Sequence, residues 1–326
     1  MRSWKLLLVT VGMFSALFGS MLAAETQDLD KLKAEVHERG WLVFSAKTDA
    51  GDWDLFVIRP DGSDRRQITK TVEFNEAGPR FSRDGKRLLY YRMPRSIPVD
   101  LGGYGTTELV LANADGTEPV VYGKDFRWAS WGPDGRQLAC LAQKEIQIVD
   151  VATRAVVRRI PRKGLASQLL WSPDGKKFIG KANGLGAYWN IGCLDVETGQ
   201  MVGIGDPERY NCTPDYTADS RRIVYAHGII GKQPGRAELW AGDVGGTERH
   251  RLYALPDYHI YGACASPEGE YLLFTRSVED LGQPKTAIMG IIRWPKAAQP
   301  ADTSSVLRLD LGPGFEPFWT AKEVVR

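Results

Sequence analysis

One short motif recurs five times and strongly limits what this chain can fold into. Each copy has an aromatic or small residue, two further residues and a tight polar turn, followed by a hydrophobic stretch. The copies are Phe81–Gly85, Trp131–Gly135, Trp171–Gly175, Tyr216–Ser220 and Ala265–Gly269. Their first residues, here called markers, are 50, 40, 45 and 49 positions apart, and a weaker sixth copy has Trp319 as its marker. Periods of this size with strand-like content predict the four-stranded blades of a β-propeller.

Residues 79–122 show how one blade is built. The sequence predicts an inner strand a at 79–82, strand b at 87–91, strand c at 108–112 and an outer strand d at 120–122. Asp84-Gly85 and Asp115-Gly116 supply the two hairpin turns, since this dipeptide favours the positive φ angles that tight hairpins require.

The two ends of the chain are predicted to share one blade. Residues 41–46, 53–58 and 65–69 resemble strands b, c and d without a strand a, whereas 315–319 resembles a strand a with little after it. Pairing them would close an all-β, six-bladed propeller over residues 41–326 and remove free sheet edges. Residues 25–40 form a short preceding segment, in which 26–38 could make an amphipathic helix through Leu29, Leu32 and Val36.

The repeats resemble those of a known family. Trp171-Ser172-Pro173-Asp174-Gly175-Lys176 and the segment Asp54–Gly62 are similar to the WD40-like "PD40" repeats of TolB-type six-bladed propellers. That resemblance covers residues 41–326 and implies the fold. It leaves the role open, because such propellers serve as periplasmic scaffolds, as gates of large peptidases and in some polysaccharide lyases. TolB proteins carry an α/β domain before the propeller, and only residues 25–40 stand in that place here, so the TolB partner role is not carried over. No Gly-x-Ser-x-Gly nucleophile motif points to a peptidase.

The first 24 residues have the pattern of a secretory signal peptide. Arg2 and Lys5 precede an apolar stretch at 6–18, and Leu22-Ala23-Ala24 offers a cleavage site before Glu25. The alternative is a membrane anchor, although the stretch is shorter than the ~20 residues of a spanning helix. We therefore expect a periplasmic or secreted protein with no transmembrane segment in its mature chain.

Charge argues against a nucleic-acid partner. The chain has 42 Lys and Arg against 40 Asp and Glu, and removal of residues 1–24 leaves 40 of each. A nucleic-acid surface needs concentrated basic charge.

Four cysteines in an exported chain allow disulfides. Cys212 and Cys264 occupy similar places in consecutive repeats and form the preferred pair. The alternative is that all four cysteines are buried as small hydrophobic residues.

Loop length predicts which face carries function. The a–b and c–d turns are short, whereas the b–c loops and d–a crossings, which open on the other face, are long and irregular. Binding residues tend to lie on such loops. The long segments are 92–107, 181–188, 205–214, 227–237, 256–263 and 277–286.

Two sets of side chains on that face are candidate ligand-binding residues. Eleven positions after five of the markers stand Arg92, Ala142, Ala182, His227 and Arg276, and three of these could bind a carboxylate or phosphate. Alternatively, each pairs with a local acid, such as Glu279 beside Arg276. The d–a crossings add Arg127, Arg209, Tyr210, Asn211, His259, Tyr261 and Glu316, and Trp189 follows the Gly-rich loop 183–186. Aromatic faces beside polar groups suit carbohydrates, although propellers also bury Trp and Tyr between blades.

Signals for metals, cofactors and catalysis are weak, and we predict none of the three. The four histidines have no i,i+4 pair, Cys-x-x-Cys is absent, Asp61–Asp64 is too short for a Ca²⁺ loop, and Gly102–Gly105 lacks a phosphate-loop context. Proton transfer by His227 or His259 with Glu316 is the one catalytic hypothesis. The sequence favours a non-catalytic propeller that presents one face to a protein or cell-envelope ligand. The alternative is a lyase-like enzyme that acts on an anionic saccharide at the central channel.

Overall fold

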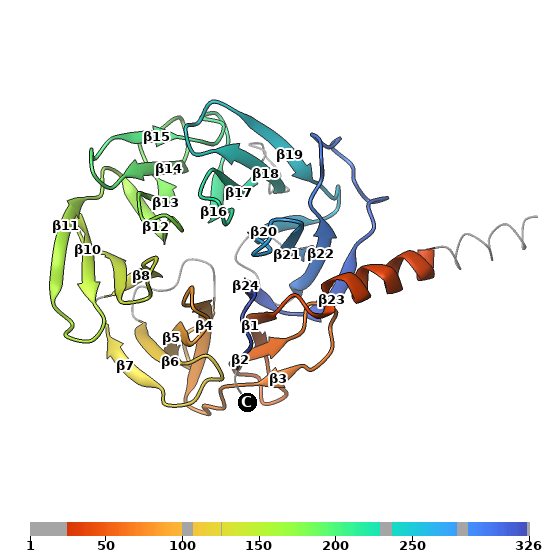
Figure 1. The fold of residues 1–326 in the computed structure, drawn as a ribbon, viewed down its shortest axis with the longest axis horizontal. Coiled ribbons are helices and arrows are strands. Elements are labelled where there is room, and N and C mark those ends of the chain that lie inside the picture. Colours follow the sequence, from red (N-terminus) through yellow and green to blue (C-terminus); the bar gives the residue numbers. More distant parts are fainter. Residues whose placement is uncertain (1–24, 100–106, 125, 229–236, 279–285, 325–326) are drawn as a thin grey trace, which may run out of the picture.

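Six four-stranded sheets make up the molecule and stand as blades around a common centre (Figure 1). The computed structural model describes residues 25–99, 107–124, 126–228, 237–278 and 286–324. Neighbouring strands within each blade pair antiparallel. The predicted six-bladed, all-β propeller is confirmed.

Every blade follows the predicted order of strands a to d from the centre outward. Blade 1 contains β24 (Phe315–Thr320), β1 (Trp41–Lys47), β2 (Trp53–Ile58) and β3 (Arg66–Gln67). Blade 2 contains β4 (Phe74–Phe81), β5 (Arg87–Pro94), β6 (Glu108–Asn113) and β7 (Val120–Gly123). Blade 3 contains β8 (Arg127–Trp131), β9 (Gln137–Leu141), β10 (Glu145–Asp150) and β11 (Val156–Pro161). Blade 4 contains β12 (Leu165–Trp171), β13 (Lys177–Ala182), β14 (Asn190–Asp195) and β15 (Met201–Gly203). Blade 5 contains β16 (Asn211–Tyr216), β17 (Arg222–His227), β18 (Glu238–Asp243) and β19 (Arg249–Tyr253). Blade 6 contains β20 (His259–Ala265), β21 (Tyr271–Ser277), β22 (Ile288–Arg293) and β23 (Leu309–Pro313).

The core lies between the blades, which explains why strand b is a continuous apolar run. In β5, Leu88 and Tyr90 pack in one cluster with blade 1, and Leu89 and Tyr91 pack in another with blade 3. All four side chains are buried. Because successive side chains of a strand point to opposite faces, a sheet buried on both faces needs hydrophobic residues at every position.

The shared blade closes the ring as predicted. β24 pairs with β1 through Leu42 opposite Trp319 and Val43 opposite Phe318. A helix over residues 25–37 lies across this junction, with Leu32 and Val36 fully buried in the cluster between blades 1 and 6. Burial of two such side chains contributes roughly 3–6 kcal/mol. The predicted amphipathic helix is therefore present and docks its apolar face.

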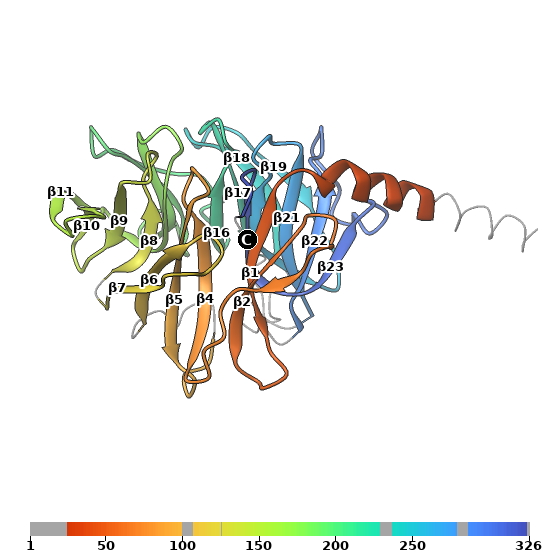
Figure 2. The ribbon, with the colours of Figure 1, turned by 60° about the horizontal axis from the view of Figure 1, so that its bottom comes forward.

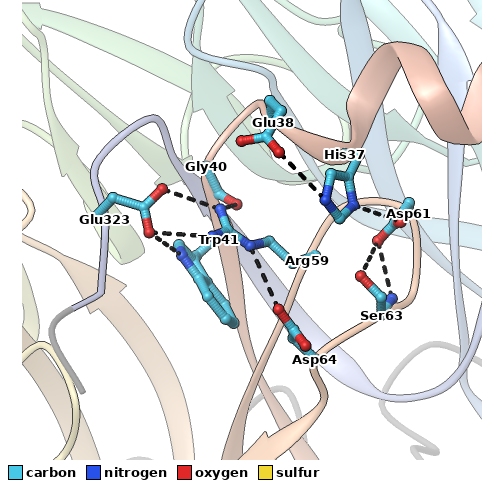
Figure 3. A network of polar contacts seen from close by, with 9 residues as sticks. All are labelled: His37, Glu38, Gly40, Trp41, Arg59, Asp61, Ser63, Asp64 and Glu323. Atoms are coloured by element: carbon cyan, nitrogen blue, oxygen red, sulfur yellow. Dashed lines mark hydrogen bonds and ion pairs between the residues drawn. The ribbon is translucent and has the colours of Figure 1, made fainter.

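Polar contacts join the end of the helix to the β2–β3 turn, and join Trp41 and Arg59 of blade 1 to Glu323 (Figure 3). His37 Nδ1 lies 2.7 Å from Asp61 Oδ2 in the β2–β3 turn. Arg59 stacks over Trp41 at 4.2 Å and donates to Glu323 at 3.0 Å, and Trp41 Nε1 donates to the same carboxylate. These contacts tie blade 1 to the segment that follows β24, the strand that completes this blade.

The repeated turn is held by its own side chains. In the copy after β12, Ser172 Oγ donates to Asp174 Oδ1 at 2.7 Å, and that oxygen also accepts the Lys176 N–H at 3.0 Å. Gly175 has φ +77°, a conformation that costs glycine little. Burial acts to raise the pKa of Asp174, but these hydrogen bonds hold it below the ordinary value. Serine, aspartate and glycine at these positions therefore specify the turn.

An unforeseen feature recurs in all six inner strands. Three positions before each marker, one residue has a positive φ, and the strand pairing slips at that point. These residues are Gly78, Trp128, Gln168, Thr213, Gly262 and Glu316. Four of them are not glycine, so the fold imposes a conformation that L-residues avoid. All six residues line one cavity of about 70 Å³ between the inner strands.

The predicted Cys212–Cys264 disulfide is wrong, because all four cysteines are free thiols. Cys212 lies four residues before its marker and Cys264 only one before its own. At ~3.3 Å per residue this places them at heights ~10 Å apart on adjacent strands, beyond the Cα separation of a disulfide. Cys140, Cys193 and Cys264 are buried, as the alternative reading expected.

Residues 1–24, the predicted signal peptide, lie outside the described residues. In the described remainder of the chain, no helix is long and apolar enough to cross a membrane.

Candidate functional site

The blades present two different faces. The b–c loops and d–a crossings emerge together, on the lower side in Figure 2, where the β1–β2 loop projects. The a–b and c–d turns emerge on the opposite side. Three of the long segments fall partly outside the described residues, at 100–106, 229–236 and 279–285. The described part of the long-loop face still contains most of the predicted site.

An aromatic cluster lies on this face where blades 4 and 5 meet. The ring centres of Tyr188 and Trp189 are 4.6 Å and 5.0 Å from that of Tyr210. Lys181 Nζ lies 3.9 Å from the Trp189 ring centre, as a cation–π contact requires. Trp189 is 41% exposed and Tyr210 37% exposed. We name Tyr188, Trp189 and Tyr210 the aromatic cluster.

Two buried amides hold the loops that carry the cluster. Asn190 Nδ2 donates to the carbonyls of Leu185 and Gly205, at 3.3 and 3.0 Å. The Asn211 N–H donates to the Trp189 carbonyl at 3.2 Å, which joins the two loops. Both asparagines are almost fully buried. The candidate Asn211 thus supports the cluster from below, since little of its side chain can reach solvent.

His227 belongs to the same support. Asn211 Nδ2 donates to the carbonyls of Asp206 and Arg209, so its Oδ1 is the acceptor toward His227 Nδ1, 3.0 Å away. This network places the imidazole proton on Nδ1. Burial lowers the pKa of His227, and the ring packs against Trp240 at 4.5 Å. At neutral pH His227 is therefore an uncharged structural donor.

The other inner-strand candidates are also largely enclosed. His259 is 5% exposed, and its Nδ1 accepts the Ala237 N–H at 3.3 Å. Tyr261 is fully buried, with its ring 6.3 Å from that of Phe315. Glu316, at φ +50°, lines a cavity of about 70 Å³ along the centre of the ring. Neither His227 nor His259 lines that cavity.

Two of the predicted cationic positions, Arg92 and Arg276, each engage a partner of their own blade. Arg92 Nε lies 2.8 Å from Glu108 Oε2, and its guanidinium stacks over Phe74. Arg276 Nη2 lies 2.9 Å from Asp310 Oδ2. The acid suggested from the sequence, Glu279, lies outside the described residues. Arg127 begins β8 and is exposed.

Sequence reasoning missed a larger cavity on the short-turn face. It has a volume of about 270 Å³ and is lined by residues at and beside the markers of all six blades. Its charged side chains are Arg80, Arg83, Asp215 and Lys322. One signal was available, because Arg83 stands where three other copies have proline, at positions 133, 173 and 267.

The described residues contain no group of three or more His, Cys, Asp or Glu side chains placed to hold a metal ion. The Gly-rich stretch 102–105, which the sequence excluded as a phosphate loop, lies outside the described residues.

Comparison with known proteins supports the fold alone. No family model matches the chain, and no curated protein matches its sequence. Among solved structures, TolB from Acinetobacter baumannii is similar with a TM-score of 0.64 and 18% identity, over 85% of this chain and 66% of that one. A putative TolB from Agrobacterium tumefaciens is similar with a TM-score of 0.55 and 19% sequence identity, over 84% of this chain and 89% of that one. A chain of a nidogen–laminin complex is similar with a TM-score of 0.57 and 10% sequence identity, over 78% of this chain and 90% of that one. This chain therefore has a TolB-like propeller fold, and it spans just under two thirds of the Acinetobacter chain.

Proposed function

We propose that this protein is an exported, non-catalytic binding propeller that presents its long-loop face to a protein or cell-envelope ligand. The observation that carries the proposal is the exposed aromatic cluster. Tryptophan and tyrosine supply large contact area with few rotatable bonds, and they dominate the energetics of protein interfaces.

Rigidity supports the same reading. The loops of the cluster are tied to each other and to the buried Asn190 and Asn211 by backbone-directed hydrogen bonds. A surface that is already ordered loses little entropy when a partner binds. The TolB-like fold is compatible with such a role.

The candidate catalytic groups favour binding over turnover. His227 is held neutral as a donor to Asn211, and His259 accepts a backbone N–H. An acid–base residue needs a free position toward substrate and a pKa near the working pH. We therefore assign both histidines to the scaffold of the face.

Site-specific photo-crosslinking tests the binding face. A photoreactive phenylalanine analogue replaces Tyr210 in cells of the source organism, and the same analogue at Val202 serves as the control. Val202 is 39% exposed but lies on the outer strand β15. We expect a discrete adduct from position 210 and none from 202. Equal adducts from both positions, or none from 210, would contradict the proposal.

Export and catalysis need separate experiments. N-terminal sequencing of the envelope protein is expected to begin at Glu25, and a retained leader would contradict export of a mature chain. For the enzymatic alternative, the protein is assayed on a polyuronate panel beside the double variant His227→Ala, His259→Ala. Turnover that disappears in the double variant would overturn the non-catalytic reading.

A further inference from the structure

The short-turn face carries a second candidate site, which is independent of the aromatic cluster. The 270 Å³ cavity lies inside the ring of inner strands, on the side of the repeated turns. Its walls include the apolar side chains of Trp131, Trp171 and Phe318. The indole N–H of Trp131 already donates to the Arg80 carbonyl at 3.0 Å, and that of Trp171 donates to the Gly175 carbonyl at 2.9 Å. These walls therefore offer mainly apolar contact.

Three cationic side chains of this cavity come from the adjacent blades 1 and 2. Arg80 is near the end of β4, Arg83 is in the turn after it, and Lys322 follows β24 of the adjacent blade. Within the described part of the chain none of the three has an ion-pair partner, in contrast to Arg39, Arg92 and Arg276. Arg80 stacks over Phe318 and donates to the Pro79 carbonyl, and these two contacts position its guanidinium.

Among the described residues that line the cavity, the one acid comes from the opposite blade. Asp215 is on β16 of blade 5, which lies across the ring from blade 2. Burial raises the pKa of Asp215 to about 6, although the charges of Arg80 and Arg83 act to lower it. Burial also lowers the pKa of Arg83, which retains solvent contact. The raised pKa of Asp215 indicates that this carboxylate is poorly hydrated, and poor hydration strengthens the electrostatic interactions around it.

We propose that this cavity binds a small carboxylate with an apolar body, held by Arg80 and Arg83 and packed against the aromatic wall. The planar guanidinium fork matches a carboxylate in two hydrogen bonds. The volume is near the lower limit of ~300 Å³ for ligand pockets, so the ligand has about the size of an amino acid or a short-chain acid. Asp215 repels the carboxylate from the far wall and so sets its orientation.

Calorimetric titration of the purified protein tests the proposal with phenylacetate and hexanoate, their neutral amides, and inorganic phosphate. We expect at least one carboxylate to bind at least tenfold more tightly than its amide and than phosphate. Arg83→Ala is expected to weaken carboxylate binding about tenfold or more, which corresponds to ~1.4 kcal/mol. Asp215→Asn is expected to strengthen it.

Arg136→Ala is the matched control, because Arg136 is an exposed arginine of the next repeated turn and does not line the cavity. This variant is expected to bind like the unaltered protein. Arg83 is exposed, so its replacement should leave the melting temperature unchanged. Equal binding of acid and amide, no binding of either acid, unchanged binding in Arg83→Ala, or weaker binding in Asp215→Asn would each overturn the proposal. If phosphate bound as tightly as phenylacetate, the proposed contact between the aromatic wall and an apolar body of the ligand would be wrong.

Discussion

Replacement of Trp319 by alanine tests the closure of the ring most directly. The side chain is 4% exposed and packs between blades 1 and 6 beside Leu32 and Val36. Removal of a buried tryptophan side chain costs about 3–5 kcal/mol. Its Nε1 also donates to the Arg39 carbonyl at 2.7 Å, and loss of that bond adds about 1 kcal/mol. We therefore expect a loss of about 4–6 kcal/mol, or roughly 8–12 °C in melting temperature.

Trp131→Ala is the matched control for this change. Trp131 is 5% exposed, occupies the marker position of blade 3, and makes one similar bond to the Arg80 carbonyl. Both variants should lose comparable stability in urea unfolding followed by circular dichroism. Only Trp319→Ala should also release the helix over residues 25–37 to limited proteolysis at low temperature. The milder Trp319→Phe keeps most of the buried area and should lose about 1–2 kcal/mol.

The reasoning fails on either of two results. A loss below about 1 kcal/mol for Trp319→Ala would mean that the junction does not depend on this side chain. Equal protease sensitivity of residues 25–37 in both variants would mean that the helix is not anchored by the closing strand.

Three further predictions concern the turns, a buried acid pair and the thiols. Gly199 and Gly246 both have positive φ in c–d turns, but an added Cβ meets nothing at Gly199 and lies 2.5 Å from the Gly203 carbonyl at Gly246. Gly199→Ala should therefore cost about 1–2 kcal/mol and Gly246→Ala clearly more, as measured by urea unfolding. Glu76 is fully buried beside Asp54, and burial together with that carboxylate raises its pKa to about 8. The protonated Glu76 therefore contributes stability that is complete below the unfolded pKa of 4.5 and is lost as pH rises through about 8. Glu76→Gln should reduce the dependence of the urea unfolding midpoint on pH between these two values. An unchanged pH dependence would contradict this assignment. All four cysteines are free, so a thiol reagent should titrate four groups in denaturant without reductant, and two would indicate a disulfide.

Much of the fold follows from the sequence because its signals are local. The Ser-Pro-Asp-Gly turn satisfies its own hydrogen bonds through Ser172 and Asp174, so a short window identifies it. The run Leu88–Tyr91 predicts burial on both faces because each residue packs against one neighbouring blade. The blade shared by the two ends follows from the number of strands predicted there, because three strand-like segments at 41–69 lack the inner strand that 315–319 supplies.

The inner-strand bulges could not be predicted, because no residue type marks them. Trp128, Gln168 and Thr213 disfavour positive φ, and only the surrounding ring imposes it. The bulge also shifts the strand register, which governs whether a side chain near the centre is buried or lines the cavity. Tyr261 is an example, since the sequence predicts it as a ligand-binding residue and the structure has it fully buried.

Partners distant in sequence were equally beyond local reasoning. Arg276 was expected to pair with a nearby acid, but its partner Asp310 is 34 residues away on the other side of β22. The cavity on the short-turn face joins Arg80 and Asp215 from opposite blades, and no spacing along the chain brings them together. Aligning the repeats by their markers does place both residues one position before a marker.

The shared blade also dictates when this chain can finish folding. β1, whose apolar side chains are buried on both faces, has its inner neighbour at Phe315–Thr320, near the end of the chain. Until those residues are available, the inner edge of β1 has no partner and the ring stays open. Contacts between such distant segments make folding slow and leave strand edges available for aggregation. The ring should therefore close only after residues 315–320 have been synthesised, and until then the inner edge of β1 should be a site where aggregation can begin.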